Sequence, residues 1–439
     1  MSCAVGVDLG TTTVKVCAVK EERILTERQV PHQANIDGRL GVQDARKILE
    51  TAESLLKKVL MDVNSEFSEV VSRIGISGQQ HGIVMWNSDS LRRGILDCSE
   101  STSSNVFPGY GMRTLCELSS YSDFDQAHHW DRCGNIMDYF ACYLTGSDEI
   151  SMSESNALAW GYSRELEWNS EIIPFTPKWM KLPKIVRVDV REFVKMGNCR
   201  LPLLEHIPVG VAIADLHASI MSVRGQYQGA DHAYLVIGTS SQLCFVVSDT
   251  LKLPTLPVTT HVFPFSKGLI LVAAASMNGG NALDAILSVI RRWSTEASNQ
   301  ECPNADMSRL MAELDQASSQ PKISPRNVPR VGSVFTAERG SVYTGVEIRG
   351  LHSDTSLIAM LVGVCEGVVR NLFGLVPPEL FSSLGVERLY LVGNAKRQRF
   401  AVHIQKCLDE LGARHITLEP AVADTSAAHG VALHAAMLK

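Results

Sequence analysis

Two stretches of the chain share one pattern, and that pattern constrains the fold more than any other feature. The first nineteen residues read MSCAVGVDLGTTTVKVCAV, with apolar runs at 4–7 and 14–19 around a turn at Gly10. Residues 232–247 read HAYLVIGTSSQLCFVV and repeat the pattern, with the turn at Gly238. Because β-branched residues flank both turns, each stretch predicts a strand–turn–strand hairpin. Two such units, one opening each half, indicate an internal duplication.

The residues in the two turns are those of phosphate-binding loops. Glycine can adopt a positive φ and lets the backbone approach a ligand closely. Backbone N–H groups that cluster in a turn form a concavity that binds anions. We predict that both turns bind phosphate, with a polar hairpin that holds no ligand as the alternative. The residues assigned to this role are Thr11, Thr12, Thr13 and Lys15 in the first turn and Gly238, Thr239 and Ser240 in the second.

Two aspartates lie at the ends of predicted strands. Asp8 closes the first apolar run, where a buried carboxylate is costly unless a partner such as hydrated Mg²⁺ offsets its charge. Asp215 follows the apolar strand 209–213 and precedes the helical run 216–222. Aspartate is common at helix N-caps, so the pattern alone leaves a capping role and a catalytic role open for Asp215.

A polar group follows the predicted strand 73–77. It reads Gly-Gln-Gln-His-Gly, and side chains just beyond the carboxyl end of a strand are typical of ligand sites in α/β sheets. Gln79, Gln80 and His81 have the donors and acceptors needed to bind the hydroxyls of a polyol. A polar loop with no ligand is the alternative.

Five longer segments carry a resemblance to a known family. They are DLGTTTVK at 8–15, GISGQQHGIVMW at 75–86, MSESNALAWGYS at 152–163, GVAIADLHASIMSV at 210–223 and AAASMNGGNAL at 273–283. Together they resemble the FGGY family of carbohydrate kinases, within the actin/hexokinase/Hsp70 superfamily. The resemblance implies an α/β protein of two ribonuclease H-like (actin-like ATPase) domains with an interdomain cleft. We expect the first domain at 1–224 and the second at 225–439.

The resemblance also implies roles for single residues and implies ATP and Mg²⁺ as cofactors. It makes Asp215 the general base and, with Asp8, a metal-site residue. It places Gln79, Gln80 and His81 in the sugar-binding stretch, where Gln80 replaces the family's usual Met. The residues it assigns to the nucleotide besides the two turns are Gly279, Gly280, Gly393 and Asn394.

Three expectations concern segments where the chain is less typical. The turn that holds adenine in the family is followed here by Lys396, Arg397 and Arg399, which we interpret as a solvated basic turn. The segment at 152–163 is expected to form part of a lid, with Asn156, Trp160 and Tyr162 lining it, although core packing is commoner for Trp and Tyr. The family's Trp-x-Asp-x-Arg stretch, whose Asp and Arg bind the sugar, is missing between CSESTSSN and VFPGYGM, as after an internal deletion.

The implied reaction is the ATP-dependent phosphorylation of a ketose at its terminal primary hydroxyl. A seven-carbon ketose is the first candidate, and its product would feed the pentose phosphate pathway. A xylulose-type pentulose kinase is an alternative. A non-catalytic, nucleotide-switched binding protein of the Hsp70 or actin type is another, although Asp215 and the Gly-Gln-Gln-His-Gly stretch argue against it.

Composition narrows the class of protein further. The net charge is −6 over 439 residues with acids and bases interspersed, which argues against nucleic acid or an anionic membrane as partner. The longest apolar stretch, 268–277, is well short of the ~20 residues that span a bilayer, and we see no signal peptide. Eleven cysteines without a CxxC pair predict reduced thiols. We therefore expect a cytoplasmic monomer or homodimer that binds a sugar and ATP.

Overall fold

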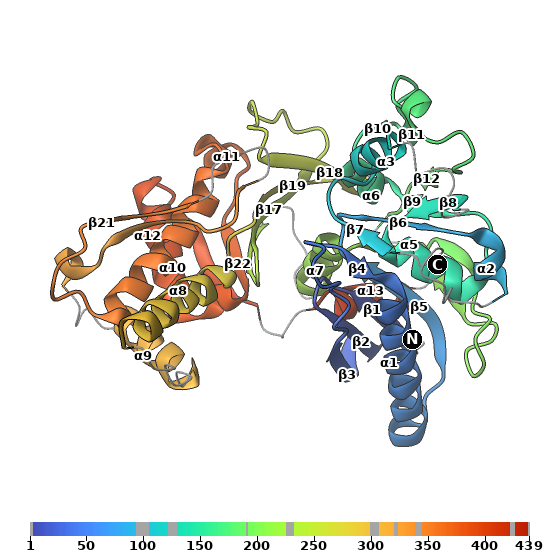
Figure 1. Cartoon of the computed structure of the whole chain (residues 1–439), viewed down its shortest axis with the longest axis horizontal. Coiled ribbons are helices and arrows are strands. Elements are labelled where there is room, and N and C mark those ends of the chain that lie inside the picture. The colour runs from blue at the N-terminus through green and yellow to red at the C-terminus, as the bar shows by residue number, and fades with distance from the viewer. Residues whose placement is uncertain are drawn as a thin grey trace. The chain divides into compact units, whose positions relative to one another are not determined.

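The computed structural model describes residues 3–93, 105–121, 130–189, 192–224, 232–298, 307–319, 324–338, 345–421 and 426–437 (Figure 1). It divides into two compact units. The first comprises Met1–Gln228, Pro264–Lys267 and Thr425–Lys439, and the second comprises Gly229–Phe263 and Gly268–Asp424. The expected boundary after residue 224 adjoins 225–231, which lie outside the described residues.

A seven-stranded sheet organises the first unit. Its strand order is β13-β14-β5-β1-β2-β3, with β15 beside β5. β1, β2 and β3 are antiparallel, whereas β5, β14 and β15 run parallel within one group that includes β1. The strands are β1 (Cys3–Leu9), β2 (Thr13–Lys20), β3 (Arg23–Pro31), β5 (Val71–Gly78), β13 (Lys195–Asn198), β14 (Pro208–Gly210) and β15 (Ile213–Ala214).

The first predicted hairpin is confirmed, and one predicted strand is divided. β1 and β2 pair with Asp8 opposite Lys15. The strand expected at 209–213 is interrupted between β14 and β15. At the interruption the Val211 N–H donates to the Val194 carbonyl, and the Ala212 carbonyl accepts from Asn156 Nδ2 at 3.3 Å. These bonds replace ladder bonds to β5, which is why the strand breaks there.

The side chains of β1 alternate between two cores, as a strand buried on both faces requires. One core joins Val5 and Val7 to the apolar sides of α1 (Ala45–Phe67) and α5 (Ile136–Thr145). The other joins Ala4 and Cys17 to small residues of α13 (Ala427–Ala436), the last helix of the chain. The helix α1 thus covers one face of the sheet.

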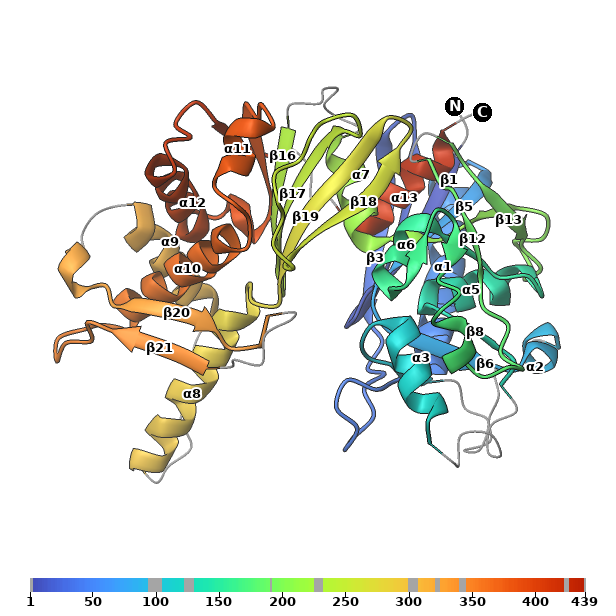
Figure 2. The same cartoon turned by 90° about the horizontal axis from the view of Figure 1, so that it is seen from above.

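The helix α13 packs closely on this first sheet. The expected division of the sequence places it in the second domain, at 225–439. A Cβ on Gly6 would lie 2.0 Å from the Ala428 carbonyl oxygen, and one on Gly75 would lie 2.3 Å from that of Val431. A Cβ on Gly430 would lie 1.8 Å from the Ala218 carbonyl oxygen in α7 (Asp215–Arg224). Figures 1 and 2 both show α13, in red, beside the blue strands. The expected second domain therefore loses its last helix to the first unit.

The remainder of the first unit surrounds a small sheet with the order β4-β7-β6-β8. Asn156 and Trp160 of the expected lid are fully buried in it, while Tyr162 is half exposed. The Trp160 indole donates to the Gly82 carbonyl at 3.0 Å, so this side chain belongs to the core and not to a lid. The elements are β4 (Gln43–Asp44), β6 (Ile83–Trp86), α2 (Ser88–Arg92), β7 (Asn105–Phe107), α3 (Gly111–Ser119), β8 (Arg132–Gly134), β9 (Ser151–Ser153), α6 (Glu154–Trp160), β10 (Ser163–Arg164), β11 (Glu167–Trp168), the 3₁₀ turn Ile173–Phe175 and β12 (Lys184–Val186).

The second unit repeats the topology of the first. Its strand order is β18-β19-β17-β16-β22-β23, with β16, β17 and β19 antiparallel and β22 and β23 parallel to β16. This matches the arrangement β3-β2-β1-β5-β14, so the predicted duplication is confirmed as a repeated topology. The strands are β16 (His232–Ile237), β17 (Ser241–Ser248), β18 (Thr260–Ser266), β19 (Leu269–Ser276), β22 (Arg388–Gly393) and β23 (Thr417–Pro420).

Helices pack against the second sheet around one apolar helix. The helix α10 is the only one among the described residues whose length and composition would allow it to span a membrane, and 67% of it is buried inside the structure. Its side chains form the centre of the second core. The other elements are α8 (Asn281–Ser298), α9 (Met307–Ser319), β20 (Arg330–Val334), β21 (Gly345–Arg349), α10 (Leu357–Gly374), α11 (Glu379–Ser383), α12 (Gln398–Glu410) and the 3₁₀ turns Pro325–Asn327 and Asn394–Lys396.

The cysteines of the described residues are free thiols, and all but Cys116 are buried. Burial raises the pKa of Cys3 and of Cys407 to about 11, so both thiols are protonated at neutral pH. Cys98 and Cys302 lie outside the described residues.

The close packing of α13 gives a direct test of the fold. Gly430→Ala would gain about 1 kcal/mol in helix propensity, but its Cβ would lie 1.8 Å from the Ala218 carbonyl oxygen. We expect a net loss of about 1–3 kcal/mol or more from overpacking, measured by chemical denaturation. Gly374→Ala is the control, since Gly374 is also helical and has no atom within 4 Å of an added Cβ. Equal effects of both changes would contradict the account of α13.

Candidate active site

Backbone register brings the first group of predicted site residues to one edge of the first sheet. Across the parallel strands, Asp8 of β1 lies opposite Ser77 of β5, and Ser77 lies opposite Ile213 of β15. Two residues further along their strands, the chain reaches Gln79 and Asp215. Since the carboxyl ends of parallel strands meet at one edge, Asp8, Gln79 and Asp215 lie at the same end of the sheet.

The Asp8 carboxylate is buried and hydrogen-bonded. The hydroxyl of Ser77 donates to Oδ1 of Asp8 at 3.0 Å. Burial raises the pKa of Asp8 to about 6, while the Ser77 hydrogen bond and the charge of Lys15 act in the opposite direction. A Cβ on Gly10 would lie 3.9 Å from Oδ2 of Asp8, so that oxygen lies beside the first turn.

This arrangement fits Mg²⁺ better than a metal that needs an all-protein cage. Carboxylate oxygens are the donors that Mg²⁺ prefers, and the ion usually keeps several waters and binds phosphates alongside one or two carboxylates. No cluster of three or more His, Cys, Asp or Glu that could hold an ion occurs in the described part of the chain. Asp8 and Asp215, at the same end of the sheet, supply carboxylates of the kind that Mg²⁺ takes together with water and phosphate.

The first turn is tight and open to solvent. The Gly10 N–H donates to the Thr13 carbonyl at 3.1 Å, and Thr11 and Thr12 are exposed. The φ of Gly10 is not positive, so a left-handed backbone is not the reason for glycine at this position. A Cβ there would lie 3.0 Å from the Thr13 carbonyl oxygen, a tight contact that glycine avoids.

The predicted sugar-binding residues have different surroundings. Gln79 is half-buried, and its Nε2 donates to Oε1 of Gln43 at 3.1 Å. Gln80 is buried, and its Nε2 lies 3.4 Å from the Ser155 carbonyl oxygen that it donates to. The His81 ring packs edge-on against Tyr110, with the ring centroids 5.2 Å apart. The strand end thus presents Gln79 and His81 more openly than Gln80.

Asp215 is the first residue of α7 and is half-buried. Its Oδ1 accepts from the Leu216 N–H at 2.7 Å. An N-cap side chain accepts from the N–H two or three residues on, whereas Asp215 is already helical and this bond comes from the adjacent N–H, so the contact does not establish the capping alternative. This contact leaves the general-base role of Asp215 a prediction, because one carboxylate can serve both purposes.

In the second unit, the turn at 238–240 is joined to the start of α8. The Gly280 N–H donates to the Gly238 carbonyl at 2.8 Å, and the Asn281 N–H donates to the Thr239 carbonyl at 3.2 Å. A Cβ on Gly279 would lie 2.5 Å from the Ser240 carbonyl oxygen, whereas the nearest atom to one on Gly238 is 3.9 Å away. Glycine is thus required at 279 by packing, while at 238 it leaves open space beside the turn.

The glycine after β22 completes this second group. Gly393 has a φ of +64°, which favours glycine, and a Cβ there would lie 2.7 Å from the Ile237 carbonyl oxygen. A Cβ on Gly280 would lie 3.6 Å from Nδ2 of Asn394. The structure therefore gathers the predicted nucleotide residues of the second half at the carboxyl ends of β16 and β22.

The interpretation of 396–399 as a solvated basic turn is wrong for Arg399. Arg399 is only 8% exposed, and its Nη1 donates to Oδ2 of Asp315 at 2.7 Å. Its Nη2 also lies 3.4 Å from Oδ1 of Asn394, to which it donates. The Asp315 carboxylate on α9 offsets the cost of burying this charge. Arg399 therefore supports Asn394 from inside the unit.

Sequence reasoning missed Glu338, because a single glutamate in a polar stretch forms no pattern. Glu338 is buried, and its Oε1 accepts from Ser276 Oγ at 2.6 Å and from Asn278 and Asn371 Nδ2, both at 2.7 Å. Its Oε2 accepts from the Met277 N–H at 3.0 Å. Glu338 thereby fixes the segment that leads into Gly279 and Gly280.

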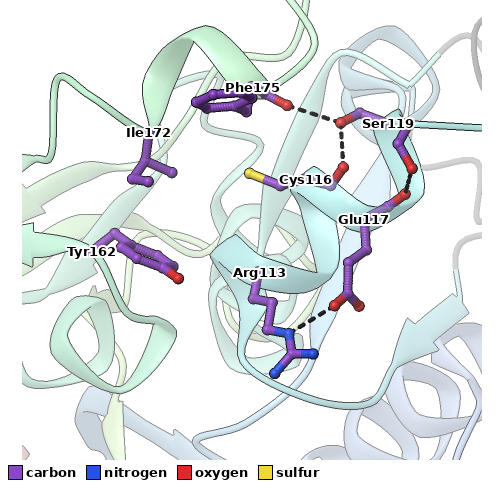
Figure 3. Close-up of a pocket in the computed structure, with 8 residues that line it drawn as sticks. Arg113, Cys116, Glu117, Ser119, Tyr162, Ile172 and Phe175 are labelled. Atoms are coloured by element: carbon purple, nitrogen blue, oxygen red, sulfur yellow. Dashed lines mark hydrogen bonds and ion pairs between the residues drawn. The ribbon is translucent and has the colours of Figure 1, made fainter.

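Figure 3 shows a separate pocket of about 480 Å³ in the first unit, between α3 and residues 162–175. Arg113 and Glu117 form an ion pair in its wall, and Ser119 Oγ donates to the Phe175 carbonyl at 2.9 Å. Tyr162 of the expected lid lines this pocket, whereas the predicted catalytic, sugar, nucleotide and metal residues do not.

Solved structures share this fold. A gluconate kinase from Lactobacillus acidophilus matches with a TM-score of 0.70 at 15% identity, covering 99% of this chain and 88% of that one. A xylulose kinase from Rhodospirillum rubrum matches with a TM-score of 0.70 at 14% identity, with 99% and 89% covered. A Plasmodium falciparum glycerol kinase with ADP matches with a TM-score of 0.70 at 15% identity, with 99% and 89% covered. The fold is therefore that of the actin-like ATPases, as predicted.

Sequence comparison narrows the class. Residues 3–106 match the model of the N-terminal domain of the FGGY family of carbohydrate kinases. Among curated relatives, it is 27% identical to human sedoheptulokinase over 447 aligned residues and 26% identical to the mouse enzyme over 443. Each alignment covers 89% of this chain and 89% of the relative. These similarities support a sugar kinase.

The role of Glu338 can be tested without a ligand. Glu338→Gln keeps the size of the side chain but places an amide NH₂ against one of its donors, so a buried donor loses its acceptor. We expect the second unit to lose about 1–3 kcal/mol of unfolding free energy in chemical denaturation. Glu347→Gln, at a glutamate exposed on β21, should stay within about 0.5 kcal/mol of the parent. A parent-like stability for Glu338→Gln would contradict the account.

Proposed function

We propose that this chain transfers the γ-phosphate of ATP to the terminal primary hydroxyl of a ketose, and that sedoheptulose is its substrate. The product, sedoheptulose 7-phosphate, would feed the pentose phosphate pathway in the cytoplasm. One observation carries the proposal: a single sheet edge gathers Asp8, Gln79 and Asp215 in a chain whose curated relatives are sedoheptulokinases. The monomer or homodimer needs no partner besides the sugar and ATP in this scheme.

In this proposal Asp215 has two tasks in phosphoryl transfer, and Asp8 has one. Asp215 accepts the proton of the attacking hydroxyl as general base. Asp8 and Asp215 would hold Mg²⁺, and the ion would offset the charge of the β- and γ-phosphates. Positioning and charge stabilisation supply most of the rate in such reactions, since little covalent chemistry falls to the protein.

The remaining residues bind the two substrates. Gln79, Gln80 and His81 bind sugar hydroxyls, and Gln79 and His81 are the more open of the three. The phosphate-binding residues of the first turn are Thr11, Thr12, Thr13 and Lys15. Those that bind the nucleotide from the second unit are Gly238, Thr239, Ser240, Gly279, Gly280, Gly393 and Asn394.

Two other functions have support of their own. A pentulose kinase is supported by the similarity to xylulose kinases, and comparing kcat/KM on sedoheptulose and xylulose separates the two substrates. A nucleotide-binding protein without sugar kinase activity is supported by the absence of the family's Trp-x-Asp-x-Arg stretch from the sequence. The adjoining residues 94–104 lie outside the described residues.

The general-base role predicts the behaviour of Asp215→Asn. The amide can still accept from the Leu216 N–H, so the start of α7 should persist. It cannot accept the hydroxyl proton, so kcat should fall by at least about 100-fold while the affinity for ATP is kept. Asp249→Asn, at an exposed aspartate, is the matched control and should leave kcat unchanged. A near-normal kcat in Asp215→Asn would rule out this role.

The missing stretch predicts that the 439-residue chain is a weak sugar kinase that still binds Mg-ATP. A hydrogen bond from a charged group to a hydroxyl contributes roughly 1.5–3 kcal/mol, so losing two would cost ~10²–10⁴ in kcat/KM. Inserting a Trp-x-Asp-x-Arg stretch from a relative between residues 104 and 105, just before β7, should restore that factor on sedoheptulose. If the two forms agree within a few-fold, other residues bind the sugar and the interpretation of the deletion is wrong.

A further inference from the structure

One buried amide connects the first phosphate turn to the sugar-binding stretch. Gln43 is 4% exposed, and its Nε2 donates to the Thr11 carbonyl at 2.8 Å and to Asn35 Oδ1 at 3.0 Å. Its Oε1 accepts from Gln79 Nε2 at 3.1 Å. Sequence reasoning gave Gln43 no role. We infer that Gln43 is a positioning residue that transmits occupancy of the Thr11 turn to Gln79, an inference that rests on the proposed function.

The orientation of both amides follows from the Thr11 carbonyl. A peptide carbonyl can only accept, so Gln43 must turn its NH₂ group toward Thr11 and its Oε1 toward Gln79. Gln79 must then turn its own NH₂ group toward Gln43. Since the two polar atoms of an amide diverge, Oε1 of Gln79 points away from Gln43. Gln79 would therefore offer Oε1 to a sugar hydroxyl as an acceptor, and the second N–H of its amide is a further donor.

The backbone around Gln43 is fixed independently of the site. Gln43 pairs with Val106 in the small sheet and bridges to Asn35. The next residue, Asp44, caps α1 by accepting from the Arg46 and Lys47 N–H groups at 3.0 and 3.3 Å. Another rotamer of Gln43 would leave buried donors and acceptors unpaired, which is costly. The Gln43 side chain is therefore held while the turns on either side of it are open.

Gln79 is also tied to the strand that leads into the turn. Its backbone N–H donates to the Leu9 carbonyl at 3.0 Å. Two bonds thus join the segment at 79 to the segment 9–11, one through the backbone and one through Gln43. A nucleotide that orders the Thr11 turn also restrains the Gln79 amide, and a sugar on Gln79 restrains the turn by the same coupling.

Hydrogen–deuterium exchange of the full chain with Mg-ADP as probe tests this inference. In the parent chain, Mg-ADP should slow exchange in residues 11–13 and also in residues 79–82. In Gln43→Leu, it should slow exchange at 11–13 only, and the protection factor gained at 79–82 should fall by about threefold or more. Asp44→Ala is the matched control, because it should raise exchange at the start of α1 and leave both ligand responses unchanged.

Equal protection at 79–82 in the parent and in Gln43→Leu would overturn the inference. If Mg-ADP changes exchange nowhere in the parent chain, the proposed nucleotide binding fails, and the free chain decides the role of Gln43. Gln43→Leu must then raise exchange in both segments, and unchanged exchange overturns the role. Should Gln43→Leu not fold, Gln43→Glu replaces it, since Glu keeps an acceptor for Gln79 and loses the donor to Thr11. Gln43→Glu should speed exchange at 11–13 and leave exchange at 79–82 as in the parent. Unchanged exchange in both segments would overturn the inference.

Discussion

The parallel pairing of β1 with β5 is the interaction on which the rest of the structure depends. It places Asp8 opposite Ser77, whose hydroxyl binds the buried carboxylate, and it brings Gln79 within hydrogen-bond distance of the Leu9 carbonyl. The pair is covered by α13, which can lie so close only because Gly6 and Gly75 have no side chains. Packing on one face of the sheet thus makes possible the polar arrangement at its end.

The same design appears twice in the chain with different chemistry. In both units an antiparallel hairpin leads into parallel strands, and the turns and strand ends gather at one edge. The first unit carries carboxylates and amides there, which suit a metal ion and a polyol. The second carries glycines and Asn394. There the N–H groups of Gly280 and Asn281 join two backbone segments by hydrogen bonds. Two buried charged side chains, Glu338 and Arg399, support that backbone through hydrogen bonds.

The sequence predicts what depends on local patterns. Both hairpins follow from apolar runs around a glycine turn, and Asp8 and Asp215 follow from their places at strand ends. Residues that act through contacts distant in sequence could not be predicted, because no local pattern marks them. Gln43 meets Thr11 and Gln79, Glu338 meets Ser276 and Asn371, and Arg399 meets Asp315 across long separations. The place of α13 depended on glycines in β1 and β5, which the helix itself does not reveal.

The most direct test of the central claim is the release of ADP from Mg-ATP by the purified chain, measured with and without sedoheptulose. The account predicts slow release that rises with the sugar, with the transferred phosphate found on the terminal carbon by mass spectrometry and NMR. A rate of ADP release that no tested ketose changes would contradict the account. That result would leave a nucleotide-binding protein whose sheet edge serves no sugar.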